Sequence, residues 1–182
     1  MKTRLVSIVI MGLMLVISVI LIIDLPEKNV KADGSGNYPP PIVGDWVIGM
    51  DTYVGNETII LNGNLIITNT GGLTLNNVTL LMNCTFDGQY HIEVQSGGWL
   101  NFTNESNITA YNVDYNYYMK VNSGTYFSME NSSVSYVGFE WGTNGDRMGL
   151  WINTDDSMIK NSTITSLGPV IPITPVIAPK IP

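Results

Sequence analysis

Apolar residues recur at matching positions along residues 64–166, between turns that are rich in glycine and asparagine. When successive stretches are aligned, three apolar columns emerge, and each column repeats at intervals of 27, 27 and 31 residues. The columns are Leu65, Ile92, Met119 and Leu150; Ile67, Val94, Val121 and Ile152; and Leu73, Leu100, Phe127 and Met158. A repeat of this length, built from short strands and polar turns, is typical of a solenoid in which each repeat forms one coil.

Alternation within each short strand predicts which side chains enter the core. Ile92 and Val94 are expected to point inward, and His91 and Glu93 outward. A third strand is expected to begin in each coil at Val78, Ile108, Val134 and Ile164. In the last coil we expect a shift of one residue, which puts Ile159 in the position beside Met129. These features predict an all-β fold, a short parallel β-helix of about four coils.

An antiparallel β-sandwich is the main alternative to stacked parallel coils. Asn62-Gly63 lies between two alternating runs, and Asn-Gly is the strongest short-range signal for a β-hairpin. The constant offset of the columns favours the parallel arrangement, because a sandwich does not require it.

Residues 1–32 have the pattern of a signal peptide or a membrane anchor. Basic residues up to Arg4 precede an uncharged stretch, residues 5–23, which as a helix would just span a bilayer and serve as a membrane anchor if it is not cleaved. Val30-Lys31-Ala32 offers small residues for cleavage before Asp33. Both interpretations place the rest of the chain outside the cytoplasm, because the basic residues precede the apolar run. We therefore expect an exported protein, extracellular or at the cell surface.

Three further segments are expected after the leader. Residues 33–53 form a linker and an N-terminal cap, and the first strands of the body are expected at Trp46–Ile48 and Thr58–Leu61. Residues 54–166 form the β-helix, and residues 167–182 a proline-rich tail. Because prolines prevent pairing as a central strand, the tail is either an extended spacer or an apolar cover for the last coil.

The charge balance and the scarcity of histidine and cysteine restrict the function. The net charge of −7 argues against a nucleic-acid partner, because such a surface repels phosphates. Cys84 is the one cysteine and His91 the one histidine, so neither a disulfide nor a metal cluster is expected, and no cofactor is predicted. Asp155 and Asp156 are adjacent in a turn, where they are explained as polar replacements for the glycine pair of other coils.

Candidate glycosylation sites are unusually frequent. Eight Asn-X-Ser/Thr sequons occur, at Asn56, Asn77, Asn83, Asn101, Asn104, Asn107, Asn131 and Asn161. In an exported protein each is a potential glycan acceptor. The fold itself offers another explanation, since asparagine suits solenoid corners and threonine suits outward strand positions. A single corner of successive coils is expected to hold Asn77, Asn107, Asn131 and Asn161.

The connections between coils form a candidate binding edge. In a solenoid they lie on one face, which commonly carries the binding site. Aromatic, carboxylate and amide groups together suit a polar, ring-shaped ligand such as a sugar; the alternative is that these are solvated turns whose aromatics pack on the coil edge. The candidate residues are Asp87, Tyr111, Asp114, Tyr115, Tyr117, Glu140, Trp141 and Arg147.

The repeat units Leu73-Thr-Leu-Asn-Asn-Val-Thr79 and Ile92-Glu-Val-Gln-Ser-Gly-Gly-Trp-Leu100 carry a family resemblance. With its Ser-Gly-Gly turns, the chain resembles exported right-handed parallel β-helix proteins of the pectin-lyase-like and NosD-like superfamily, and looks most like archaeal surface proteins. The resemblance spans about Thr58 to Ser166. It implies a fold rather than a reaction, because that fold carries lyases, hydrolases, adhesins and inert spacers.

We therefore expect a non-catalytic module with a structural or adhesive role that contacts a cell-surface or extracellular polysaccharide. The alternative is a polysaccharide lyase or glycoside hydrolase, or a fragment of one. Asn153-Thr154-Asp155 is similar to the Asn-Thr-Asp of pectin-degrading β-helix hydrolases, but their Gly-His-Gly and Arg-Ile-Lys motifs have no counterpart here. A third alternative is a subunit that associates end to end through its open coils.

Overall fold

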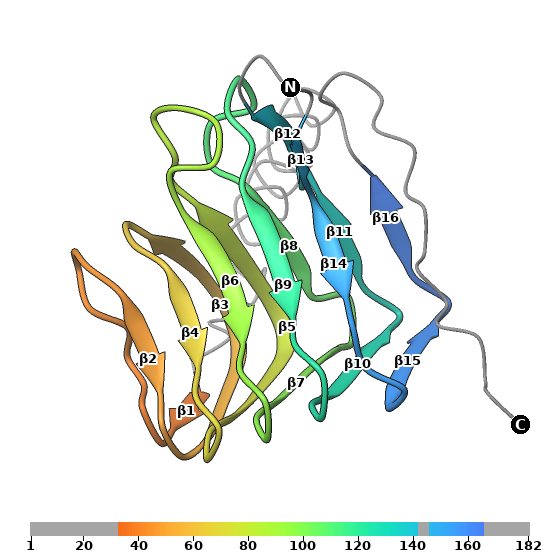
Figure 1. Cartoon of the computed structure of the whole chain (residues 1–182). Coiled ribbons are helices and arrows are strands. Elements are labelled where there is room, and N and C mark those ends of the chain that lie inside the picture. The colour runs from red at the N-terminus through yellow and green to blue at the C-terminus, as the bar shows by residue number, and fades with distance from the viewer. Residues whose placement is uncertain (1–32, 142–145, 166–182) are drawn as a thin grey trace, which may run out of the picture. The chain divides into compact units, whose positions relative to one another are not determined.

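The computed structural model describes residues 33–141 and 146–165 of the 182-residue chain. Within these ranges the elements are all β-strands, wound into a parallel β-solenoid (Figure 1). The predicted leader, residues 1–32, and the predicted tail, residues 167–182, lie outside the described residues. In the part of the chain that is described, no helix is long and apolar enough to cross a membrane.

One wall of the solenoid is a five-stranded parallel sheet. Its strands are neighbours in the order in which they occur along the chain, one from each layer of the stack. They are β2 (Trp46–Ile48), β4 (Leu65–Ile67), β6 (His91–Val94), β9 (Tyr118–Val121) and β14 (Leu150–Ile152).

A nine-stranded sheet forms the rest of the stack. The long strands of the first two layers give way to pairs of shorter strands, because later layers are divided by a corner. The parallel strands are β3 (Asp51–Leu61), β5 (Gly72–Met82), β7 (Trp99–Thr103), β8 (Asn107–Ala110), β10 (Tyr126–Glu130), β11 (Ser133–Ser135), β15 (Ser157–Lys160) and β16 (Thr163–Thr165). The ninth, β1 (Asp33–Ser35), pairs antiparallel with β3, and a separate antiparallel pair joins β12 (Phe139–Trp141) to β13 (Asp146–Met148).

The parallel register confirms the predicted solenoid and excludes the sandwich. In the first column, Leu65 pairs with Ile92, and Met119 pairs with Ile92 on one side and with Leu150 on the other. The second column is confirmed in the same way. Asn62-Gly63 does not form a hairpin, since it joins β3 to β4, which belong to different sheets. Its glycine fits there because a Cβ at Gly63 would lie 2.0 Å from the carbonyl oxygen of Gly44.

The third column is wrong in its last member. Phe127 pairs with Ser157 rather than with Met158, because Ser157 follows Ile152 by five positions whereas Phe127 follows Val121, the register partner of Ile152, by six. As a result, Ile159 lies beside Met129, as expected.

The prediction that the third strand of the first coil begins at Val78 is also wrong. Ile108 pairs with Leu80, and Val78 lies within the continuous strand β5. The third-strand positions of the later coils are confirmed, since Val134 pairs with Ile108 and Ile164 pairs with Val134.

The stack begins one layer before the predicted columns. Trp46 pairs with Leu65 and Ile48 pairs with Ile67, so β2 continues the parallel sheet toward the N-terminus. The indole of Trp46 is buried, and its Nε1 donates to the carbonyl oxygen of Asn37 at 2.6 Å.

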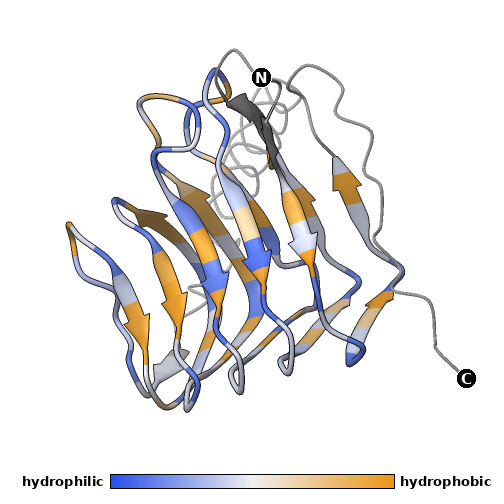
Figure 2. Cartoon of the chain, in the orientation of Figure 1, coloured by the Kyte–Doolittle hydropathy of each residue, from blue (hydrophilic) through white to orange (hydrophobic). Residues whose placement is uncertain are grey.

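The core is a column of aliphatic side chains enclosed by the two sheets. Figure 2 shows hydrophobic residues alternating with polar ones along the strands. Leu65, Ile92 and Met119 are fully buried, and Cys84 is a buried free thiol. The last layer is more open, since the side chains of Met158 and Ile159 are 39% and 46% exposed.

Candidate binding surfaces

The connections before β6 and β9 lie against each other, as the predicted binding edge requires. The backbone N–H of Asn116 donates to Asp87 Oδ1 at 2.7 Å, and that of Gly88 donates to the carbonyl oxygen of Asn116 at 2.8 Å. Tyr111 is 53% exposed, Asp114 is exposed and Tyr115 is half-buried against the core. These four candidate residues, Asp87 included, share one edge of the solenoid.

Tyr117 does not belong to that edge. Its side chain is fully buried, and its hydroxyl donates to the carbonyl oxygen of Ile108 at 3.0 Å. Burial raises the pKa of the Tyr117 phenol well above its usual value. Tyr117 is in phase with the inward positions Met119 and Val121 of the strand that follows it, so it is part of the core.

Glu140, Trp141 and Arg147 occupy the β12–β13 hairpin in the third connection. Glu140 pairs with Arg147, and Trp141 pairs with Asp146. Their side chains lie outside the described part of the structure.

The outer face of the five-stranded sheet carries a second group of polar and aromatic side chains. His91 and Tyr118 are neighbours in register, and their rings stack with centroids 4.7 Å apart and planes 9° from parallel. In the next row, Lys120 Nζ lies 3.8 Å from Glu93 Oε1 and 5.9 Å from the ring centroid of Trp151. We call this group, His91, Glu93, Tyr118, Lys120 and Trp151, the sheet-face cluster.

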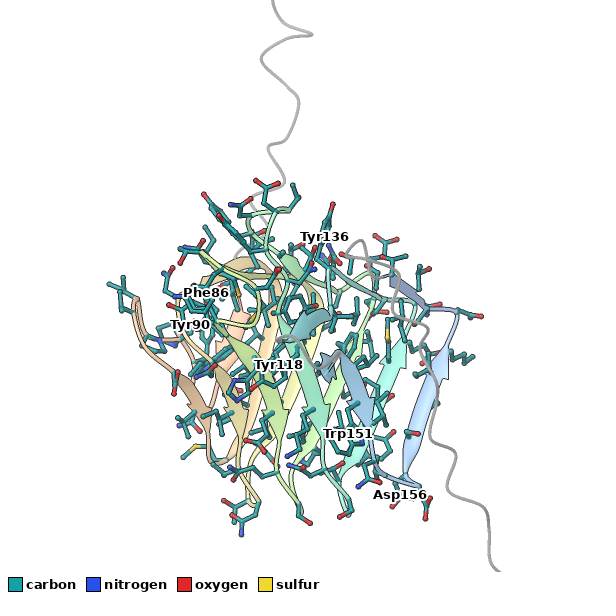
Figure 3. The ribbon with its side chains drawn as sticks, turned by 45° about the horizontal axis from the view of Figure 1, so that its top comes forward. Phe86, Tyr90, Tyr118, Tyr136, Trp151 and Asp156 are labelled. Carbon is teal, nitrogen blue, oxygen red and sulfur yellow. The ribbon has the colours of Figure 1, made fainter. Side chains whose placement is uncertain are left out.

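Register explains why these residues meet. Glu93 pairs with Lys120, and Lys120 pairs with Trp151, so one outward row crosses three consecutive strands. Asn122 continues the contact, donating from Nδ2 to Glu93 Oε1 at 3.0 Å. In Figure 3, Tyr118 and Trp151 lie between Phe86 and Tyr90 at the connections and Asp156 at the opposite end of the strands. The edge formed by the connections before β6 and β9, which we call the loop edge, therefore continues onto the sheet-face cluster.

Electrostatics on this face are balanced rather than strongly charged. Lys120 contacts both the Glu93 carboxylate and the Trp151 ring, and its side chain remains 40% exposed. Burial lowers the pKa of His91, so its imidazole is neutral near pH 7. Trp151 is 54% exposed. The cluster can stack on a ring and hydrogen-bond to hydroxyl groups.

A third surface follows one corner of the solenoid. Five asparagines at this corner have left-handed backbone conformations with φ between 47° and 56°, and all five side chains are exposed. They are Asn56, Asn77, Asn104, Asn131 and Asn161, which we call the asparagine corner. Asparagine tolerates this conformation better than most residues with a Cβ.

The predicted corner is correct except for one member. Asn107 pairs with Thr79 rather than with Asn77 and does not have a left-handed backbone, so the corner asparagine of that layer is Asn104. Asn77 Nδ2 donates to Asn56 Oδ1 at 2.9 Å, and Asn104 Nδ2 donates to Asn76 Oδ1 at 2.9 Å. An open groove of about 570 Å³ lies here, lined by four corner asparagines together with Asn76 and Glu105.

Asp155 and Asp156 are exposed in the turn before β15, and among the side chains that the structure describes no three His, Cys, Asp or Glu residues are grouped so as to hold a metal ion.

Comparison with known proteins adds no further identification. No protein-family model matches the chain, and no curated protein or solved structure is significantly similar to it.

Proposed function

We propose that this protein is a non-catalytic, exported module with a structural or adhesive role, which binds cell-surface or extracellular polysaccharide. The solenoid supplies a stiff support, because each inner layer is held by backbone hydrogen bonds to the layers on both sides. Binding takes place along the loop edge and across the sheet-face cluster.

The exposed Trp151 beside Lys120 and Glu93 carries this proposal. An aromatic ring next to hydrogen-bonding groups suits a pyranose, whose C–H faces pack on the ring while its hydroxyls meet polar neighbours. The cluster spans the consecutive parallel strands β6, β9 and β14, about 4.8 Å apart, and a surface that extends along the stack suits a polymer better than a small molecule.

We also infer that the chain is a member of the exported pectin-lyase-like and NosD-like group of surface proteins. The Ser-Gly-Gly turns and the recurrent strand units support this relationship. Its leader, residues 1–32, supports export, either as a cleaved signal peptide or as an anchor through residues 5–23.

Retention on immobilised polysaccharide tests the proposal. A panel of neutral and uronate polymers is used, and Trp151→Ala is expected to reduce retention on the bound polymer by about tenfold, the loss of one aromatic contact. Tyr126→Ala is the matched control, because Tyr126 is 49% exposed but lies on the nine-stranded sheet. Equal retention of wild type and Trp151→Ala, or no retention on any polymer, would contradict polysaccharide binding.

An enzyme is the alternative class, favoured only by the similarity of Asn153-Thr154-Asp155 to a hydrolase motif. It predicts release of reducing sugars or unsaturated products from uronate polymers. Turnover that Asp155→Ala abolishes would replace the binding proposal with this one.

A further inference from the structure

We propose that the asparagine corner is an array of N-glycan acceptor sites, and that the sequons at Asn83, Asn101 and Asn107 are not modified. The inference rests on the export included in the proposed function. It separates the eight sequons into two classes by their place in the fold.

Exposure distinguishes the first class. Each corner asparagine is exposed and lies where the chain changes direction, so its side chain leaves the sheet surface. Four of the five asparagines line the open groove, and Asn161 is exposed as well, so a glycan on any of these Nδ2 atoms extends into solvent. The solenoid therefore accommodates sugars at this corner without moving a strand.

The other three sequons are half-buried and held by neighbouring layers. Asn83 Nδ2 donates to Asn62 Oδ1 at 2.7 Å, and Asn107 Oδ1 accepts from Ser133 Oγ at 2.9 Å. Asn101 lies between its register partners Thr74 and Ser128, with strands about 4.8 Å away on both sides. Burial rather than hydrogen bonding separates these sequons from the corner, since Asn77 Nδ2 donates in the same way as Asn83 Nδ2. A glycan at the half-buried positions would have to displace neighbouring side chains.

The amide hydrogen bonds of the corner are compatible with modification. In the transfer, Asn77 Nδ2 forms a bond to the anomeric carbon of a lipid-phosphate-linked oligosaccharide. The bond from that carbon to the phosphate oxygen breaks, the phosphate leaves with the electron pair, and the amide gives up one proton to a base of the host transferase. One N–H remains on Nδ2, and it can still donate to Asn56.

The hydroxyl residue of each sequon allows a test that leaves the corner intact. Thr79→Ala destroys the Asn77 sequon but keeps the asparagine with its left-handed backbone. Thr74→Ala is the matched control, because Thr74 is also half-buried on β5 and belongs to no sequon. Ser106 is unsuitable for this purpose, since its buried hydroxyl donates to the carbonyl oxygen of Thr103 at 2.7 Å.

The experiment uses the full chain in an N-glycosylating host, once with its own N-terminus and once with a host signal peptide placed before Met1. Glycopeptide mass spectrometry of the secreted protein measures occupancy at each sequon. We expect glycans at corner asparagines, none at Asn83, Asn101 or Asn107, and loss of the Asn77 glycan in Thr79→Ala but not in Thr74→Ala.

Secreted protein without glycans, or with the strand sequons occupied as often as the corner, overturns the inference. Failure of export gives a different result. If only the form with the host signal peptide is secreted, the chain's own leader does not direct export, which counts against the proposed function. The occupancy pattern is then read from the secreted form.

Discussion

The indole ring of Trp99 lies directly against Gly72, its register partner in the preceding layer. A Cβ added to Gly72 would be 1.9 Å from Cε2 of that ring. The absence of a side chain at Gly72 is therefore what allows the Trp99 ring to occupy this position on the nine-stranded sheet.

Gly72→Ala is expected to lower the free energy of unfolding by about 1–3 kcal/mol, because the indole must leave its position. The measurement is urea denaturation followed by tryptophan fluorescence. In a Trp99→Ala background the same substitution should cost much less, since the obstructing ring is gone. An equal cost in both backgrounds would show that the two residues are not coupled.

The left-handed backbone of Asn77 gives a second prediction. Asn77→Ala and Asn77→Gly both remove the hydrogen bond to Asn56, but only alanine keeps a Cβ at a φ of 56°. We expect the alanine variant to be less stable than the glycine variant by about 1–2 kcal/mol.

Asn76 provides the control for Asn77, because it is the adjacent residue in β5 and has an ordinary strand conformation. There the order should reverse, with glycine less stable than alanine, since glycine loses more backbone entropy on folding. The same order at both positions would mean that φ at Asn77 is not the cause.

The columns predicted the fold because aliphatic residues must stack on aliphatic residues in a parallel solenoid. Leu65 and Ile92 are separated by 27 residues and meet in register, so the offset alone located them. Prediction failed where the number of residues in a turn changed. Met158 was placed one position too far along, and Asn107 was assigned to a corner that Asn104 occupies.

The sheet-face cluster could have been found from the same offsets. Glu93 was correctly expected to point outward, and the intervals of 27 and 31 residues lead from it to Lys120 and then to Trp151. Tyr117 could not be placed by composition, because an aromatic residue beside polar neighbours suits either a binding loop or a core edge. Its burial is decided by the strand that follows it.

The pKa of His91 gives a prediction about pH. Burial is the largest influence and lowers the pKa; Glu93 and Asp45 raise it, and Lys120 lowers it. The folded state therefore favours the neutral imidazole, and the unfolded state binds the proton more readily. The contribution of His91 to stability is complete above pH 6.5, the pKa of the imidazole in the unfolded state. It is lost as the pH falls through the lower pKa of the folded state.

As the pH is lowered from about 7.5 to about 5.5, we expect the urea concentration at the unfolding midpoint to decrease for the wild type and to decrease less for His91→Phe. Phenylalanine preserves a ring against Tyr118 and cannot take up a proton, so the stacked neighbour stays in place. Parallel midpoint curves for the two proteins would assign the pH dependence to other groups.

The last layer of the stack gives the final prediction. Among the described residues, β14, β15 and β16 have strand partners on one side only, and Ile159 is 46% exposed beside the exposed Met158. Open strand edges with apolar side chains pair readily with another chain. We expect sedimentation velocity to show association that grows with concentration, and Ile159→Lys to reduce it, while Phe86→Lys at the loop edge has no effect.

A variant shortened to end at Ser166 distinguishes two segments that could cover the last layer, namely a second copy of the chain and residues 167–182. If a second copy covers the last layer, the shortened chain associates as the full chain does. If residues 167–182 cover it, the full chain remains monomeric and the shortened chain associates, because removal of an apolar cover exposes the edge. A monomer in both cases would mean that the unpaired edge of β14–β16 is not an association surface.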